Sequence, residues 1–137
     1  MSFYTAINCM DGRVQLPVIY YLKERFGVPY VDVITEPGPV ALLSSDPESD
    51  ASRSIFQRVE VSLNAHHSKG IAMVAHVDCA GNPVSDAEQR EQMRVCLRVL
   101  AKRYPAVALI GLWVDDTWAV SEIESDLSVS CQGEEDN

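Results

Sequence analysis

The sequence lacks the features that mark secreted and membrane proteins. It has only four cysteines in 137 residues, too few for the disulfide framework of a small secreted domain. No apolar run approaches the roughly 20 residues of a membrane-spanning helix. The first residues show no basic segment followed by a long apolar run, so we expect no signal peptide. These absences predict a cytoplasmic protein whose thiols stay reduced.

Positive charge is also scarce. The chain has 11 Lys and Arg against 20 Asp and Glu, a formal net charge of −9, and its pI is about 4.6. This balance argues against nucleic acid and anionic membrane surfaces as partners. Part of the negative charge lies in residues 126–137, which we expect to form a disordered tail. Residues 1–125 have the size of one domain and show no internal repeat, so we expect a single domain.

Short apolar runs alternate with stretches of helical periodicity along the chain. The apolar runs predict four strands, over residues 3–7, 30–35, 71–77 and 107–114. The periodic stretches predict three helices, over residues 15–26, about 52–68 and 86–103. Two prolines make residues 36–39 a loop, and residues 40–50 are polar and irregular. Residues 118–123 can return as a short antiparallel edge strand.

This alternation predicts a three-layer α/β fold. We expect a mostly parallel, four-stranded sheet with right-handed crossovers and helices on both faces. A strand order of 2-1-3-4 makes the first and third strands neighbours and sends their following helices to opposite faces. The carboxyl ends of those two strands are then a topological switch point, where open α/β sheets build their sites.

Two motifs follow these two central strands. Cys9-Met10-Asp11-Gly12-Arg13 follows the first strand, and His76-Val77-Asp78-Cys79 lies at the end of the third. Taken singly, Cys9, His76 and Cys79 are each typical of a buried core. Together they supply two thiolates and one imidazole, the soft donors that zinc prefers. We therefore predict a Zn²⁺ site with Cys9, His76 and Cys79 as ligands.

Asp11 and Arg13 belong to the same site. If the first motif is extended, Cys9, Asp11 and Arg13 point the same way, because side chains alternate along a strand. An arginine two residues from a carboxylate can bind it through both nitrogens of its fork. Such a pair would keep Asp11 ionised and orient it near the metal.

The pair of motifs, Cys9-x-Asp11-x-Arg13 followed by His76-x-x-Cys79, resembles the β-class carbonic anhydrase family, in its short prokaryotic branch. The resemblance implies zinc bound by the two cysteines and the histidine. It also implies that Asp11 either takes the fourth metal position or pairs with Arg13 and leaves that position to water. Asp11 and Arg13 would then be the catalytic residues.

The resemblance extends over roughly residues 3–123 and implies a function. The expected activity is that of a zinc lyase: reversible hydration of carbon dioxide to bicarbonate by a zinc-bound hydroxide. Because two thiolates offset the metal charge, we expect activity to rise toward alkaline pH. The family also implies a homodimer or a higher even oligomer, for which Trp113, Trp118 and the fourth strand could supply an interface.

Two alternatives stay open. One is hydrolysis of a related small molecule such as carbonyl sulfide. The other is a zinc-binding protein without catalysis, in which Asp11 permanently holds the fourth position, since closed zinc sites are structural. Family members usually carry an Arg-Asn-Ala-Gly segment after the second strand. Here Thr35-Glu36-Pro37-Gly38-Pro39 keeps only the glycine, which favours the non-catalytic alternative.

Overall fold

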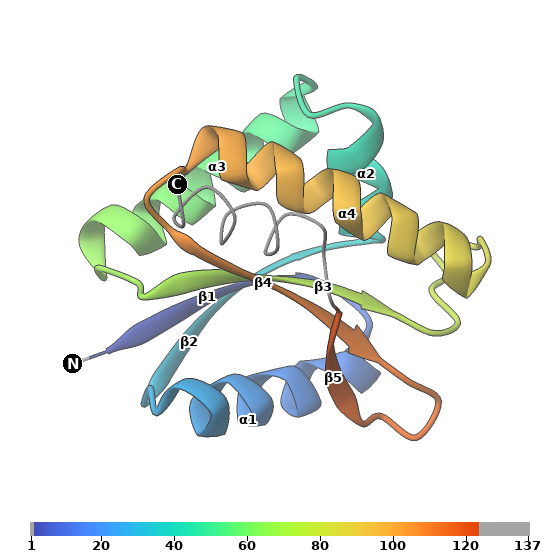
Figure 1. Ribbon diagram of the computed structural model, residues 1–137, viewed down its shortest axis with the longest axis horizontal. Coiled ribbons are helices and arrows are strands. Elements are labelled where there is room, and N and C mark those ends of the chain that lie inside the picture. Colours follow the sequence, from blue (N-terminus) through green and yellow to red (C-terminus); the bar gives the residue numbers. More distant parts are fainter. Residues whose placement is uncertain (1, 124–137) are drawn as a thin grey trace, which may run out of the picture.

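The computed structural model describes residues 2–123 and contains one sheet with helices on both faces (Figure 1). The strands are β1 (Phe3–Cys9), β2 (Tyr30–Glu36), β3 (Gly70–His76), β4 (Ala108–Val114) and β5 (Val120–Ile123). The helices are the 3₁₀ turn η1 (Gly12–Val14), α1 (Gln15–Phe26), α2 (Pro39–Ser45), α3 (Asp50–Ala65) and α4 (Asp86–Arg103). Within residues 2–123, no helix is both long and apolar enough to cross a membrane.

The sheet confirms the predicted order. Its strands follow the order β2-β1-β3-β4-β5. The first four are parallel, and β5 pairs antiparallel with β4 at the edge. The fold is therefore the predicted three-layer α/β arrangement, with five strands because the edge strand forms.

The two faces of the sheet carry different helices. In Figure 1, α1 lies on one side and α2, α3 and α4 lie on the other, so the helices that follow β1 and β3 are on opposite faces as expected. A separate apolar cluster fills each space between sheet and helices. All seven residues of β3 are buried, which explains why its sequence is a continuous apolar run rather than an alternating one.

Side chains cap the longer helices. The Ser49 hydroxyl accepts a hydrogen bond from the Ser52 amide at the start of α3, and Ser85 does the same for Glu88 at the start of α4. Helix α1 ends at Phe26 and is followed by Gly27, which has a φ of 64°. Glycine adopts this left-handed conformation without the clash that a Cβ would cause.

One prediction about local structure was wrong. Residues 40–50 were expected to be irregular, but helix α2 begins at Pro39 and ends at Ser45. Pro39 occupies the first turn, where its missing N–H costs no hydrogen bond. Val40 and Leu43 are three residues apart and fully buried, so packing against the core stabilises a helix too short for periodicity to reveal. The acidic tail expected over residues 126–137 lies outside the described residues, and the domain boundary at 125 stays a prediction.

Candidate metal centre

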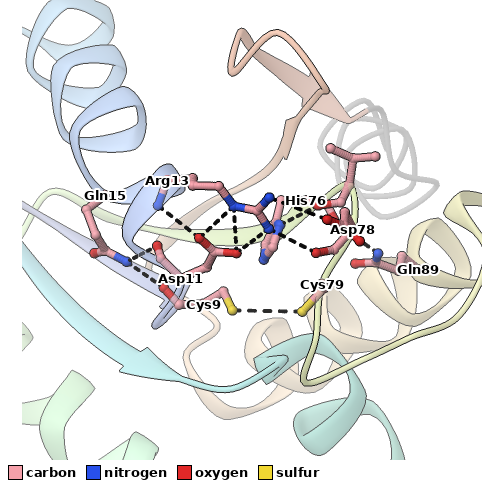
Figure 2. Close-up of polar contacts among 9 residues, drawn as sticks. Cys9, Asp11, Arg13, Gln15, His76, Asp78, Cys79 and Gln89 are labelled. Carbon is pink, nitrogen blue, oxygen red and sulfur yellow. Dashed lines mark hydrogen bonds and ion pairs between the residues drawn. The ribbon is translucent and has the colours of Figure 1, made fainter.

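The sheet brings the three predicted ligands together. Cys9 is the last residue of β1, and His76 is the last residue of the neighbouring strand β3. Cys79 follows after a turn in which Asp78 has a φ of 56°. Cys9, His76 and Cys79 are all buried, and their ligand atoms lie within 4.8 Å of one another (Figure 2). Among the described residues, no other group of His, Cys, Asp and Glu side chains meets this criterion.

His76 presents one ring nitrogen that is ready to bind a metal. Its Nδ1 lies 2.7 Å from the Val77 carbonyl, so Nδ1 carries the proton and donates it, which leaves a lone pair on Nε2. This Nε2 is buried and has no hydrogen-bond partner among the described residues. The Gln89 side chain donates to the His76 carbonyl at 2.8 Å. Buried polar atoms are rarely unpaired, so an unpaired Nε2 beside two thiols fits a metal ligand at this position.

The spacing of the sulfurs also fits zinc. The two Sγ atoms of Cys9 and Cys79 lie 3.8 Å apart. Two thiolates that each lie about 2.3 Å from a tetrahedral zinc are separated by about 3.8 Å. The donor set, the sulfur spacing and the orphaned Nε2 together fit a zinc ion held by Cys9, His76 and Cys79.

The two thiols ionise at different pH. Burial raises the pKa of Cys9, but the His76 imidazole and the backbone amides of Gly38 and Asp11 lower it further, to about 7. Burial and the nearby Cys9 sulfur raise the pKa of Cys79 to about 11. Near neutral pH, the first thiol is therefore partly ionised while the second keeps its proton.

Asp11 and Arg13 form the expected bidentate pair. The Arg13 Nη2 lies 2.7 Å from Asp11 Oδ2, and Nε lies 3.0 Å from Oδ1. The Arg13 guanidinium lowers the pKa of Asp11 to about 2, which keeps this carboxylate ionised at working pH. Asp11 is not part of the cluster of mutually close ligand atoms. It lies at the edge of the site, paired with the arginine.

The backbone of this motif differs from the extended form that was assumed. Asp11 is the N-cap of η1, where Oδ1 accepts the Arg13 amide at 2.9 Å. The chain therefore turns immediately after Cys9. Gln15 secures the turn, because its side-chain amide donates to the carbonyls of Cys9 and Asp11 at 2.7 and 2.9 Å. The pair forms through this turn and not through alternation along a strand.

Several residues that shape the site were missed from the sequence. Gln15 and Gln89 donate hydrogen bonds to backbone carbonyls of the site. A single glutamine in a helical sequence does not indicate such a role. Gly38 was noted only as a loop residue, and Gly81 was not singled out. In the structure, a Cβ on Gly38 would lie 2.7 Å from the Gly81 carbonyl oxygen, so the loops that follow β2 and β3 contact each other through these two glycines.

The expected interface residues are placed differently. Trp113 is 5% exposed and packs within the chain, with the Arg90 guanidinium over its ring at 4.7 Å. Strand β4 pairs with β3 along its length but with β5 only over Gly111–Val114. The chain's own packing therefore covers Trp113, whereas residues 108–110 of β4 and Trp118 are partly exposed, so an interface through them stays a prediction.

Comparison with known proteins supports one family. A family model described as "Putative carbonic anhydrase" matches residues 1–124, and no curated protein matches the chain. The β-carbonic anhydrase CafA of Aspergillus fumigatus shares 15% identity, covering 94% of this chain and 80% of its own, with a TM-score of 0.59. Tetrameric β-carbonic anhydrases of Sordaria macrospora share 14% identity with this chain, and the TM-score is 0.60. The match covers 88% of this chain and 79% of the Sordaria macrospora chain. The structural matches show the fold, and the family model shows that this chain belongs to the carbonic anhydrase family that it describes.

Proposed function

We propose that this protein is a zinc-dependent carbonic anhydrase that catalyses the reversible hydration of carbon dioxide to bicarbonate. One observation carries the proposal. Three buried zinc-type ligands, Cys9, His76 and Cys79, lie beside a carboxylate that an arginine holds outside their cluster. A structural site would complete its tetrahedron with a fourth side chain, whereas a catalytic zinc site keeps one position for water or substrate.

Zinc bound at this site would act as a Lewis acid that activates water for attack on carbon dioxide. The side chains around the metal position would orient the reacting group and exclude bulk water. Asp11, ionised and held by Arg13 through two nitrogens, can accept a hydrogen bond and so orient the attacking group. Cys9 and His76 are 4% and 1% exposed. This burial keeps bulk water from the ligands and strengthens the electrostatic interactions within the site.

The test is a stopped-flow assay of carbon dioxide hydration by zinc-loaded protein from about pH 6 to about pH 9. We expect activity that rises with pH and is lost, together with bound zinc, in Cys79→Ser. Cys96→Ala is the matched control, because Cys96 is also a buried thiol but lies on α4 outside the cluster. Zinc-loaded protein without hydration activity at any pH would contradict the proposal.

A second candidate function is a zinc-binding protein without catalysis. The segment at the end of β2, Thr35 to Pro39, departs from the usual family sequence, and its acidic residue makes an ion pair outside the site. Glu36 pairs with Arg58 of α3 at 2.6 Å. If this segment fails to complete a substrate site, the same assay will find zinc but no hydration. An assay of carbonyl sulfide hydrolysis on the same zinc-loaded protein distinguishes a carbonyl sulfide hydrolase from a carbonic anhydrase and from a non-catalytic zinc protein.

The proposal includes assembly and location. The Sordaria macrospora enzymes are tetrameric, which supports a homodimer or a higher even oligomer here too. Free thiols as zinc ligands favour the reducing cytoplasm.

A further inference from the structure

Two residues with unusual backbone conformations lie against Arg13. Within residues 2–123, the non-glycine residues with positive φ are His67, Asp78 and Trp118. Asp78 and Trp118, at 56° and 62°, both contact Arg13. A left-handed backbone costs free energy in any residue with a Cβ, so it persists only where the surrounding structure enforces it, and such residues gather at functional sites.

Trp118 lies under the guanidinium. The Arg13 Cζ atom is 4.8 Å from the centre of the Trp118 ring, within the range of a cation–π interaction. The loop between β4 and β5 positions this ring. The Asp115 carboxylate accepts the Thr117 and Ala119 amides at 2.8 and 3.1 Å, and its carbonyl accepts the Trp118 amide at 2.9 Å. The turn, and not Arg13, therefore determines where the ring lies.

Asp78 is a second carboxylate partner of the same arginine. Its Oδ2 lies 3.4 Å from Arg13 Nη1, and its carbonyl accepts Nη2 at 3.2 Å (Figure 2). Asp11 binds more closely, at 2.7 Å. The Asp78 side chain is 81% exposed, against 19% for Asp11, so Asp78 is free to move closer. Two carboxylates thus share one guanidinium, one bound closely and the other loosely.

We infer that Trp118 and Asp78 are positioning residues for Arg13, and that the Asp78 carboxylate becomes its ion-pair partner when Asp11 moves to the metal ligands. The inference rests on the proposed zinc site. Trp118 holds the guanidinium in the position where Asp11 binds it. Because Asp78 then pairs with Arg13, departure of Asp11 does not leave the arginine without a partner. Asp78 therefore stabilises the arrangement in which Asp11 occupies the metal.

Cobalt-substituted protein can report on this exchange. Azide binds the metal only where Asp11 has not taken the position, so its affinity, measured from the cobalt absorption bands, follows the fraction of open sites. Asp78→Asn should raise azide affinity about two- to fivefold. Trp118→Ala should lower it about two- to fivefold, because a loosened Arg13 releases Asp11, and Trp118→Phe should retain it. Asp116→Asn, which removes an exposed carboxylate of the β4–β5 loop, should have no effect.

A double variant separates the exchange from simple charge repulsion. In an Arg13→Ala background, Asp78→Asn should not change azide affinity, because the exchange passes through the arginine. A rise that persists there would show that Asp78 only repels the anion, and would overturn its role. Unchanged affinity in the Asp78→Asn single variant would overturn it as well.

A measurement without metal tests the Trp118 contact. In metal-free protein, the NMR resonance of the Arg13 Nε–H proton should carry the ring-current shift of the indole. The shift should disappear in Trp118→Ala and remain in large part in Trp118→Phe. A resonance that does not respond to Trp118→Ala would overturn the role of Trp118. Absence of cobalt–thiolate bands in the unmodified protein would instead overturn the zinc site and, with it, the exchange at Asp78.

Discussion

At the scale of single residues, neighbouring groups decide which of the three candidate ligands carry protons at a given pH. Cys9 and Cys79 are both buried thiols, yet they differ in pKa. Cys9 faces the His76 imidazole and two backbone amides that favour its thiolate, whereas Cys79 faces the sulfur of Cys9. Burial alone would lower the pKa of His76, but the interaction with the Cys9 sulfur raises it. A metal ion must displace the protons that remain, because only thiolates and neutral imidazole bind it.

The first prediction concerns these protons. At about pH 9, Cys9 is ionised and Cys79 keeps its proton, so zinc binding should release the Cys79 proton. At about pH 6, Cys9 is protonated and so is His76, whose pKa is raised, and the release should approach three protons. Zinc affinity should therefore rise with pH, most steeply on the acid side of pH 7. Calorimetry in buffers of different ionisation enthalpy measures the release, and a value independent of pH would contradict the assigned pKa directions.

The second prediction concerns the Asp11–Arg13 pair. Arg13→Ala removes the partner that holds Asp11 outside the ligand cluster, so the variant should keep zinc and lose about 10- to 100-fold in hydration rate. Asp11→Ala should also keep zinc, because three protein ligands remain, and should lose activity to a similar extent. Metal analysis and stopped-flow rates on the same samples check both. Loss of zinc in Asp11→Ala would show that Asp11 is a fourth ligand.

At the scale of secondary-structure elements, the site depends on two loops that meet at glycines. The loop after β2 places the Gly38 amide near the Cys9 sulfur, and the loop after β3 carries Cys79. A Cβ on Gly81 would lie 2.8 Å from the Pro37 carbonyl carbon and 2.9 Å from the Gly38 nitrogen. These neighbours are backbone atoms that cannot rotate away, so a larger residue must separate the loops.

The third prediction follows from this contact. Gly81→Ala should lower zinc affinity about 10- to 100-fold, the range seen when groups that orient metal ligands are altered. Gly12→Ala is the control, since a Cβ there meets no atom within 4 Å although Gly12 lies within the first motif. Competition with a zinc-chelating dye measures both affinities. Equal affinities in the two variants would mean that the loop contact does not position Cys79.

At the scale of the whole molecule, an apolar surface accompanies the site. Among the described residues, the exposed large apolar side chains include Leu16 and Tyr20, one turn apart on α1, and Met10, which follows Cys9 directly. Their exposed fractions are 57%, 61% and 61%. Residues four apart share one face of a helix, so α1 offers this face to a partner beside the turn that carries Asp11 and Arg13.

The fourth prediction is that this face forms the subunit contact of the proposed homodimer or higher even oligomer. Sedimentation at micromolar concentration should show a mass at least twice the 15.1 kDa of one chain. Leu16→Glu should dissociate the assembly, because it places a charge in an apolar contact. Val61→Glu, at an equally exposed position on α3, should not. A monomer in the unmodified protein would refute the contact.

Much of the fold was predictable because its signals are local. The run that ends at Cys9 and the run that ends at His76 are apolar, short and followed by polar motifs, and parallel strands bring such ends together. Helix α2 was not predictable, because its seven residues are stabilised by burial of Val40 and Leu43 and not by a pattern of their own. The turn after Cys9 was missed for a similar reason, since Gln15 secures it from the next helix.

The sequence by itself predicted the types of the candidate ligands and the Asp11–Arg13 pair, because these depend on residue chemistry and on neighbours close along the chain. It also predicted the order of the strands, because the alternation of strands and helices restricts how parallel strands connect. Only the tertiary structure decided which nitrogen of His76 is bare, how the two thiols differ in pKa, and that Asp78 and Trp118 contact Arg13. These properties arise from groups distant in sequence that meet at a few ångströms, in a buried setting where short-range electrostatics and hydrogen-bond geometry dominate.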